Sequence, residues 1–197
     1  NDARQHHTKR PTGCRIAIVD IDFHHGNGTQ EIFYKRSDVF YCSIHADPDV
    51  EFPYFSGRAN ERGVAQGEGY NLNIPLPLDS SAQKSGYGVS EREYFSAVDQ
   101  AAQAVRDFDA DILVISAGLD TYLRDPVGGF GLEADSYTRI GQKLAELRLP
   151  TLLVQEGGYD LDGLGDCIEA LLQPFVQRIA GSNAPLDVQS TKRSARK

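Results

Sequence analysis

The 197-residue sequence lacks several features, and each absence excludes a class of protein. It contains no apolar run near the roughly 20 residues that a membrane-spanning helix requires, so we expect no membrane partner. It has only three cysteines, Cys14, Cys42 and Cys167, and no CxxC pair. This pattern argues against a disulfide framework and predicts reduced, buried cysteines of a cytoplasmic protein, with the nucleus not excluded if the source is eukaryotic.

Positive charge is also scarce, with 20 Lys and Arg against 28 Asp and Glu and a formal net charge of −8. Direct nucleic-acid binding requires a basic surface, so this balance argues against a nucleic acid as partner. The acidic excess is compatible with a cationic substrate such as a lysine tail or a polyamine. The sequence does not begin with methionine, and we therefore expect a chain that starts within a longer protein.

Polar, aperiodic segments stand at both ends. Residues 1–11 are predicted to be a polar N-terminal tail and residues 181–197 a polar, basic C-terminal tail. Residues 12–180 are long enough for one domain with a core. Four apolar runs bounded by polar residues predict strands buried on both faces of a parallel sheet, at residues 15–20, 39–44, 112–116 and 151–155. An alternating run at residues 70–76 predicts an edge strand or an extended loop.

Helical patterns fill the gaps between these runs. Ser90 and Glu93 form a capping box ahead of apolar residues at helical spacing. Asp135 is predicted to cap a helix that runs to about Leu147, and a last helix is predicted over residues 161–179. Strands that alternate with helices predict an α/β domain, with a mostly parallel sheet flanked by helices.

Two long loops are predicted directly after strands, at residues 45–69 and 118–134. Loops of this length inside a domain are usually functional, and the ends of strands are where open α/β sheets bind ligands.

The segment after the first predicted strand is the most informative. Asp20, Asp22 and His24 alternate in it, so a continuing strand would present all three on one side. Two carboxylates and an imidazole at the C-terminal end of a strand have the chemistry of a zinc site, and the repulsion between the carboxylates favours a resident cation. The alternative is a helix-capping acid followed by solvent-facing histidines.

Two further segments end predicted strands at the same edge. Asp120 is placed to supply a third metal ligand, which would leave an open coordination position for water and substrate. The alternative is an acid that only caps its loop. Tyr159 follows Gly157 and Gly158, and its hydroxyl is a candidate hydrogen-bond donor to an oxyanion. The alternative is an aromatic residue packed after a glycine turn.

Four linked motifs therefore occur in order: Asp20-Ile21-Asp22-Phe23-His24-His25-Gly26-Asn27-Gly28-Thr29, Ser43-Ile44-His45, Leu119-Asp120-Thr121 with Asp125-Pro126, and Glu156-Gly157-Gly158-Tyr159. They resemble the zinc-dependent histone deacetylase and acetylpolyamine amidohydrolase family. Asn27 and the pair Gly128-Gly129 resemble its class II-like and acetylpolyamine branch. The resemblance implies an arginase/deacetylase-like fold, present here as the C-terminal portion of the catalytic domain with the N-terminal part missing.

The resemblance also implies roles for residues. It makes Asp22, His24 and Asp120 the ligands of Zn²⁺, Tyr159 the group that polarises the acetyl carbonyl, and Asp20 the carboxylate that orients a catalytic histidine. A structural K⁺ is implied as well, with the ligand set Asp20, Asp22, His24, Ser43 and Ile44. The wall of the substrate tunnel is predicted at Phe52, Tyr54, Phe55, Val127 and Gly128.

The implied reaction is hydrolysis of the acetyl amide of acetyl-lysine or of an acetylated polyamine. The family uses a His-His pair in a glycine-rich upstream loop, whereas His6 and His7 have no glycine beside them. We therefore expect a partial domain that lacks the pair, is inactive alone and needs the missing N-terminal segment as its partner. The alternative is a non-catalytic metal-binding or interaction module. A two-metal ureohydrolase is disfavoured, because it requires more clustered Asp and His.

Overall fold

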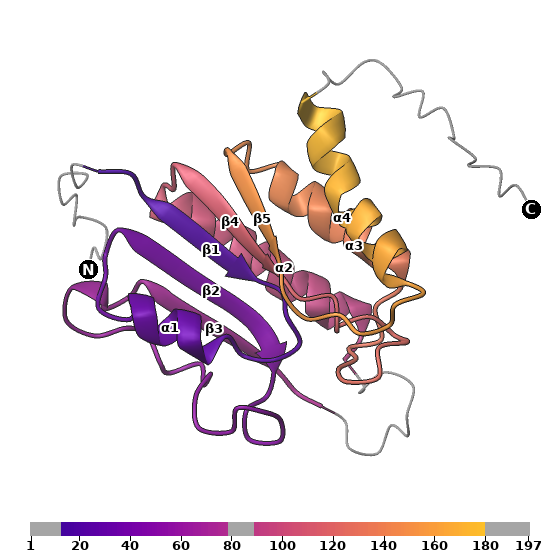
Figure 1. Ribbon diagram of the computed structural model, residues 1–197. Coiled ribbons are helices and arrows are strands. Elements are labelled where there is room, and N and C mark those ends of the chain that lie inside the picture. The colour runs from indigo at the N-terminus through magenta and orange to yellow at the C-terminus, as the bar shows by residue number, and fades with distance from the viewer. Residues whose placement is uncertain (1–12, 79–88, 180–197) are drawn as a thin grey trace, which may run out of the picture.

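The computed structural model describes residues 13–78 and 89–179, so both predicted tails, with His6 and His7, lie outside the described residues. Five parallel strands form one sheet in the order β3-β2-β1-β4-β5 (Figure 1). The strands are β1 (Ile16–Asp20), β2 (Val39–Ala46), β3 (Asn71–Leu76), β4 (Ile112–Ala117) and β5 (Thr151–Gln155). The helices are α1 (Asn27–Phe33), α2 (Glu91–Phe108), α3 (Ala134–Ala145) and α4 (Leu164–Ile179). The predicted α/β fold is confirmed.

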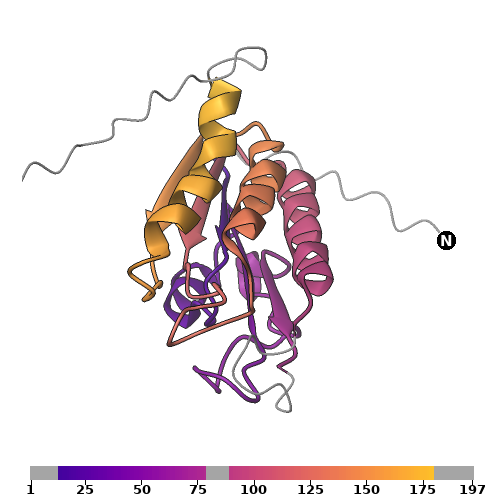
Figure 2. The same ribbon diagram turned by 90° about the vertical axis from the view of Figure 1, so that its right-hand side faces the viewer.

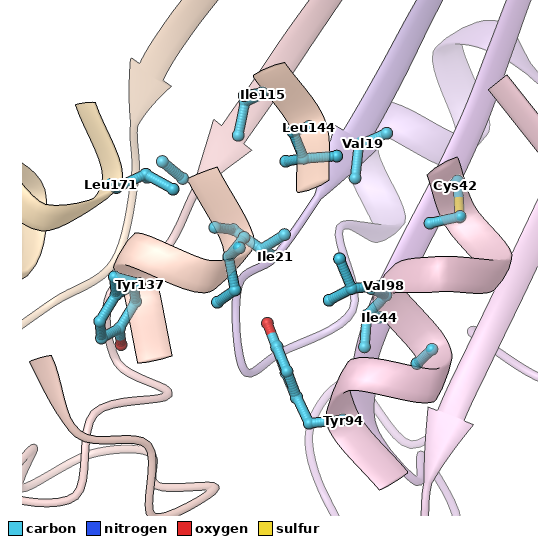
Figure 3. Packing of buried hydrophobic residues seen from close by; sticks show 14 of the residues in the cluster. Val19, Ile21, Cys42, Ile44, Tyr94, Val98, Ile115, Tyr137, Leu144 and Leu171 are labelled. Carbon is cyan, nitrogen blue, oxygen red and sulfur yellow. The ribbon is translucent and has the colours of Figure 1, made fainter. Parts of the chain in front are cut away.

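Alternate strand residues pack on opposite faces of the sheet. Val19 of β1 and Ile115 of β4 point to the face that α2, α3 and α4 cover, where they join one large apolar cluster with Val98 of α2 and Leu144 of α3 (Figure 3). The other face carries a smaller cluster of Ile18, Val39 and Tyr41, against which Phe33 of α1 packs. Helix α1 is the described helix on that side (Figures 1 and 2). No helix in the described ranges is long and apolar enough to cross a membrane.

Strand β5 has an open edge and an open face. It pairs with β4 on one side, and no other described strand pairs with its second side. Leu152 is 57% exposed and Val154 is 38% exposed, on the sheet face opposite α4. An apolar edge strand without charge or proline offers unpaired backbone groups to other polypeptides. This part of the sheet therefore exposes apolar side chains beside an unpaired strand edge, an arrangement that favours self-association.

The N-termini of α2 and α3 show how well local sequence signals predict where a helix begins. Ser90 caps α2 as expected, because its hydroxyl accepts the Glu93 N–H and the Glu93 carboxylate accepts the Ser90 N–H. The predicted N-cap of α3 was wrong by two residues. Glu133 is the N-cap and forms the reciprocal pair with Ser136, while Asp135 lies in the first turn. A carboxylate there still interacts favourably with the positive end of the helix dipole.

Other expectations also need correction. Helix α4 begins at Leu164 rather than at residue 161, because a turn closed by the Gly163 N–H and the Asp160 carbonyl precedes it. Helix α1 was not predicted, since its first residues, Asn27 and Gly28, have low helix propensity. Strand β2 runs to Ala46, so the loop after it starts two residues later than predicted. Cys42 and Cys167 are buried as predicted, but Cys14 is exposed.

Candidate metal centre

The C-terminal ends of the parallel strands meet at one edge of the sheet (Figure 1). Strand β1 ends at Asp20, so Asp22 and His24 lie in the loop that follows and not on a continuing strand as expected. The loop is held to the segment after β4, because the Ile21 N–H donates to the Ser116 carbonyl and the Phe23 N–H donates to Oδ1 of Asp120 at 2.9 Å. Hydrogen bonds from backbone N–H groups thus hold the two acidic loops together.

The structure places Asp22, His24 and Asp120 in one cluster. Each offers one ligand atom, and these atoms lie within 4.8 Å of one another. The His24 Nδ1 is 3.1 Å from Oδ2 of Asp120 and 3.5 Å from Oδ1 of Asp22. Two carboxylate oxygens and one imidazole nitrogen are donors that Zn²⁺ prefers, and three protein ligands leave a position for substrate or water. The residues present fit a catalytic zinc ion.

The electrostatics of this cluster favour a cation. Hydrogen bonds to Asp120 and Asp22 raise the pKa of His24 to about 10. Burial, with the charge of Asp22, raises the pKa of Asp20 to about 7, and burial also raises the pKa of Asp120. Without a metal ion, a proton on His24 offsets part of the negative charge. A divalent ion held by these residues would replace that proton and would balance the carboxylates more fully.

Asp20 lies beneath the cluster and is 2% exposed. Its Oδ1 accepts the Asp22 N–H at 3.1 Å, and its Oδ2 accepts the Tyr41 hydroxyl at 2.8 Å. The role of Tyr41 was not predicted, because its position on a central strand resembles that of any core aromatic residue. Strand register sets Ser43 beside Asp20. The structure therefore brings Asp20 and Ser43 together, and binding of K⁺ by Asp20, Asp22, His24, Ser43 and Ile44 stays a prediction.

Two further histidines lie behind the cluster. The rings of His25 and His45 are 4.5 Å apart, and both residues are buried. The Nε2 of His45 is 2.8 Å from the Gly57 carbonyl, so it carries the proton, and Nδ1 accepts the Ser43 hydroxyl at 2.7 Å. Burial lowers the pKa of His25 to about 3 and that of His45 to about 4. Both side chains are therefore neutral near pH 7, and they support the site as packing groups.

The predicted tunnel residues lie on two loops. All three rings are exposed, and the Phe52 ring stands edge-on to His24 with centroids 6.2 Å apart. Across the site, Val127 is 51% exposed, and Gly128 packs so closely that a Cβ would collide with the Asp120 carbonyl. Of the predicted aromatic wall, Phe52 is thus the ring that reaches the metal cluster.

A polar network anchors the loop that carries Phe52. The Glu61 carboxylate accepts Nε2 of Gln30 at 2.6 Å and the Gly57 N–H at 3.0 Å. The Oε1 of Gln30 in turn accepts the side-chain amides of Asn71 and Asn73 from β3. Helix α1 and strand β3 therefore hold the aromatic loop in place, an arrangement that was not predicted from the sequence.

Tyr159 belongs to the loop after β5. The Gly157 carbonyl of that loop accepts the Leu119 N–H at 2.8 Å, so the loop runs beside Asp120. Tyr159 is 52% exposed. Partial burial, and then the charges of Asp120 and Asp22, raise the pKa of its hydroxyl. The hydroxyl therefore keeps its proton at neutral pH and is able to donate a hydrogen bond.

The chain is similar to known proteins. Residues 3–175 match the family described as histone deacetylase domain. The chain belongs to the histone deacetylase family. Among family members, acetylpolyamine amidohydrolase 1 of Pseudomonas aeruginosa is 48% identical over 161 residues, which cover 82% of this chain and 44% of that protein. Histone deacetylase 18 of Arabidopsis thaliana is 35% identical over 187 residues, covering 91% of this chain and 26% of that protein.

Solved structures of the histone deacetylase family have the same fold. The crystal structure of acetylpolyamine aminohydrolase from Burkholderia pseudomallei superposes with a TM-score of 0.76 at 42% identity, covering 82% of this chain and 45% of that one. A histone deacetylase homologue from Aquifex aeolicus gives a TM-score of 0.73 at 29% identity, covering 82% of this chain and 42% of that one. The chain thus spans less than half the length of these relatives.

Proposed function

We propose that this chain carries the metal centre of a zinc-dependent amidohydrolase that removes acetyl groups from acetylated polyamines or acetyl-lysine. The observation that carries the proposal is the convergence of Asp22, His24 and Asp120 within 4.8 Å at the edge of the sheet that also bears Tyr159. The chain is similar to proteins named acetylpolyamine amidohydrolase and histone deacetylase, and the two proposed substrate classes come from those names.

The chain's own residues fit parts of this reaction. When bound, zinc supplies Lewis-acid polarisation of the acetyl carbonyl and lowers the pKa of water. The Tyr159 hydroxyl donates a hydrogen bond to the carbonyl oxygen as negative charge develops on it. Phe52, beside His24, packs against the aliphatic part of the substrate. Asp20 holds the loop of the metal ligands through the Asp22 N–H.

Hydrolysis also requires a group that takes a proton from water and gives one to the leaving amine. Within residues 13–78 and 89–179, His25 and His45 are buried and neutral, and both carboxylate oxygens of Asp20 accept hydrogen bonds. We propose that the general base lies outside the described residues. The same observation favours a second candidate, a metal-binding module without turnover.

The test is zinc binding and turnover by the 197-residue chain. Titration calorimetry measures zinc stoichiometry, and acetate release measures turnover of an acetylated polyamine and of an acetyl-lysine peptide. One bound zinc ion, with turnover that falls about 10²–10³-fold in Tyr159→Phe, supports the amidohydrolase. One bound zinc ion without turnover is what we expect of the chain alone, and it fits both candidates. Turnover on addition of a polypeptide segment that supplies a general base would then favour the amidohydrolase over the module. Failure to bind zinc would contradict both candidates.

A further inference from the structure

Asp125 connects two loops that flank the metal cluster. It is 8% exposed and lies between β4 and α3. Its Oδ1 accepts the backbone N–H groups of Val127 at 2.9 Å and Gly128 at 3.2 Å. Its Oδ2 accepts the N–H groups of Tyr159 at 2.6 Å and Asp160 at 3.3 Å. One buried carboxylate therefore binds four backbone donors from two segments of the chain.

These bonds are strong for a physical reason. A carboxylate is a strong acceptor for backbone N–H groups, and in a buried position water competes poorly for these hydrogen bonds. The side chain of Tyr159 is half exposed, and no described residue hydrogen-bonds its hydroxyl. No described hydrogen bond fixes the tip of the ring, so the position of the backbone at residue 159 sets the region that the hydroxyl can reach. Asp125 is the side chain that holds this backbone.

We propose that Asp125 is the positioning residue for Tyr159. It sets the place of the Tyr159 hydroxyl relative to the cluster of Asp22, His24 and Asp120, and it couples this placement to the opposite wall at Val127 and Gly128. This inference rests on the proposed function, in which the Tyr159 hydroxyl binds the acetyl carbonyl. The carboxylate does not touch the substrate and acts through Tyr159.

The substitution Asp125→Asn separates this role from packing. An asparagine keeps the volume but offers one acceptor oxygen, so its NH₂ group must face one of the two pairs of N–H donors. Asp125→Glu is the second variant, because it keeps the charge and displaces the carboxylate by one methylene. Asp162→Asn is the matched control, since Asp162 lies on the same loop and is exposed.

The first measurement is ¹⁹F NMR of protein labelled with 3-fluorotyrosine, with the Tyr159 resonance assigned from its loss in Tyr159→Phe. We expect Asp125→Asn and Asp125→Glu to shift or broaden this resonance, and Asp162→Asn to leave it unchanged. This readout needs no metal. An unchanged Tyr159 resonance in both Asp125 variants would overturn the positioning role, whatever the result for zinc.

The second measurement is binding of a linear alkyl hydroxamate, whose carbonyl resembles that of the substrate, to the zinc-loaded chain. We expect Asp125→Asn to weaken hydroxamate binding about tenfold, which corresponds to roughly 1.4 kcal/mol, with zinc affinity within about twofold of the wild type. The double variant Asp125→Asn/Tyr159→Phe should bind no more weakly than Tyr159→Phe alone. Additive losses would overturn the inference, whereas absence of zinc binding in the wild type would contradict the proposed function.

Discussion

The backbone N–H of Gly157 donates to Oδ2 of Asp22 across 3.2 Å. The loop after β5 therefore touches the loop that supplies two of the proposed metal ligands. A Cβ at residue 157 would lie 2.8 Å from Oδ2 of Asp22 and 2.9 Å from Oδ2 of Asp120. Glycine is required here by close approach, because a side chain would displace both carboxylates.

Gly157→Ala should therefore weaken zinc binding by at least about tenfold, or roughly 1.4 kcal/mol, as measured by titration calorimetry. Gly165→Ala is the matched control, because a Cβ at that position in α4 meets nothing within 4 Å. The control should bind zinc normally and gain about 0.5–1 kcal/mol of stability from helix propensity. Wild-type zinc affinity in Gly157→Ala would show that the two carboxylates do not form the site.

Zinc should raise the stability of the folded chain, because the three ligands come together only in the folded state. At a free zinc concentration one hundred times the dissociation constant, the expected gain is about 2.7 kcal/mol. Asp120→Ala should remove this zinc-dependent increment, and Asp99→Ala, on α2 in an exposed ion pair with Lys143 of α3, should retain it. Thermal unfolding with zinc and with a chelator measures both, and an equal increment in the two variants would contradict the ligand role of Asp120.

The burial of neutral His45 predicts a pH-dependent contribution to stability. Its pKa is about 4 in the folded state, against about 6.5 when unfolded, so between these values the unfolded state binds more protons. The free energy of unfolding of the wild type, relative to His45→Gln, should fall by up to about 3 kcal/mol as the pH decreases from about 6.5 to about 4. Asp20 and His25 titrate in both proteins, so their contributions largely cancel in the difference between the two free energies of unfolding. Urea unfolding measures the difference, and a difference independent of pH would contradict the burial of neutral His45.

The open face of β5 should promote self-association. Leu152 and Val154 expose apolar side chains next to an unpaired strand edge. The double variant Leu152→Lys/Val154→Lys should shift the wild-type chain toward monomer in sedimentation velocity, because charge on the face and edge opposes strand pairing. Leu161→Lys, at a residue 83% exposed before α4, serves as the comparison and should have little effect. A wild type that is monomeric at all concentrations would contradict this prediction.

The central sheet was predictable because its strands are continuous apolar runs, although β5 is not buried on both faces as expected. Continuous apolar runs set β1, β4 and β5 to within one residue of their observed bounds. The grouping of Asp22, His24 and Asp120 was also predicted, although the loop after β1, and not strand alternation, brings the first two together. The C-terminal ends of adjacent parallel strands lie at one edge of the sheet in any such topology. Once the strands are predicted from local apolar runs, the grouping of the residues that follow them is therefore predicted too.

The remaining parts of the site depend on contacts between distant segments, which no local pattern encodes. The bond between Gly157 and Asp22 joins residues 135 positions apart, and that between Asp125 and Tyr159 joins residues 34 positions apart. Tyr41 and Gln30 resemble ordinary core or helix residues until their partners, Asp20 and Glu61, are placed. Helix α1 was missed for a related reason, since tertiary packing overrides the weak helix propensity of Asn27 and Gly28.

The position of β1 in the middle of the sheet has a consequence for the order of folding. On one side β1 pairs with β2, which follows it closely, and on the other with β4, from which most of the chain's first half separates it. Closing long loops is slow, so β1, β2 and β3 are expected to assemble before β4 docks. His24 and Asp120, 96 positions apart, meet only at that docking. Metal bound by this cluster would therefore be captured late in folding, because a nascent chain holds no complete set of the proposed ligands until Asp120 has been made.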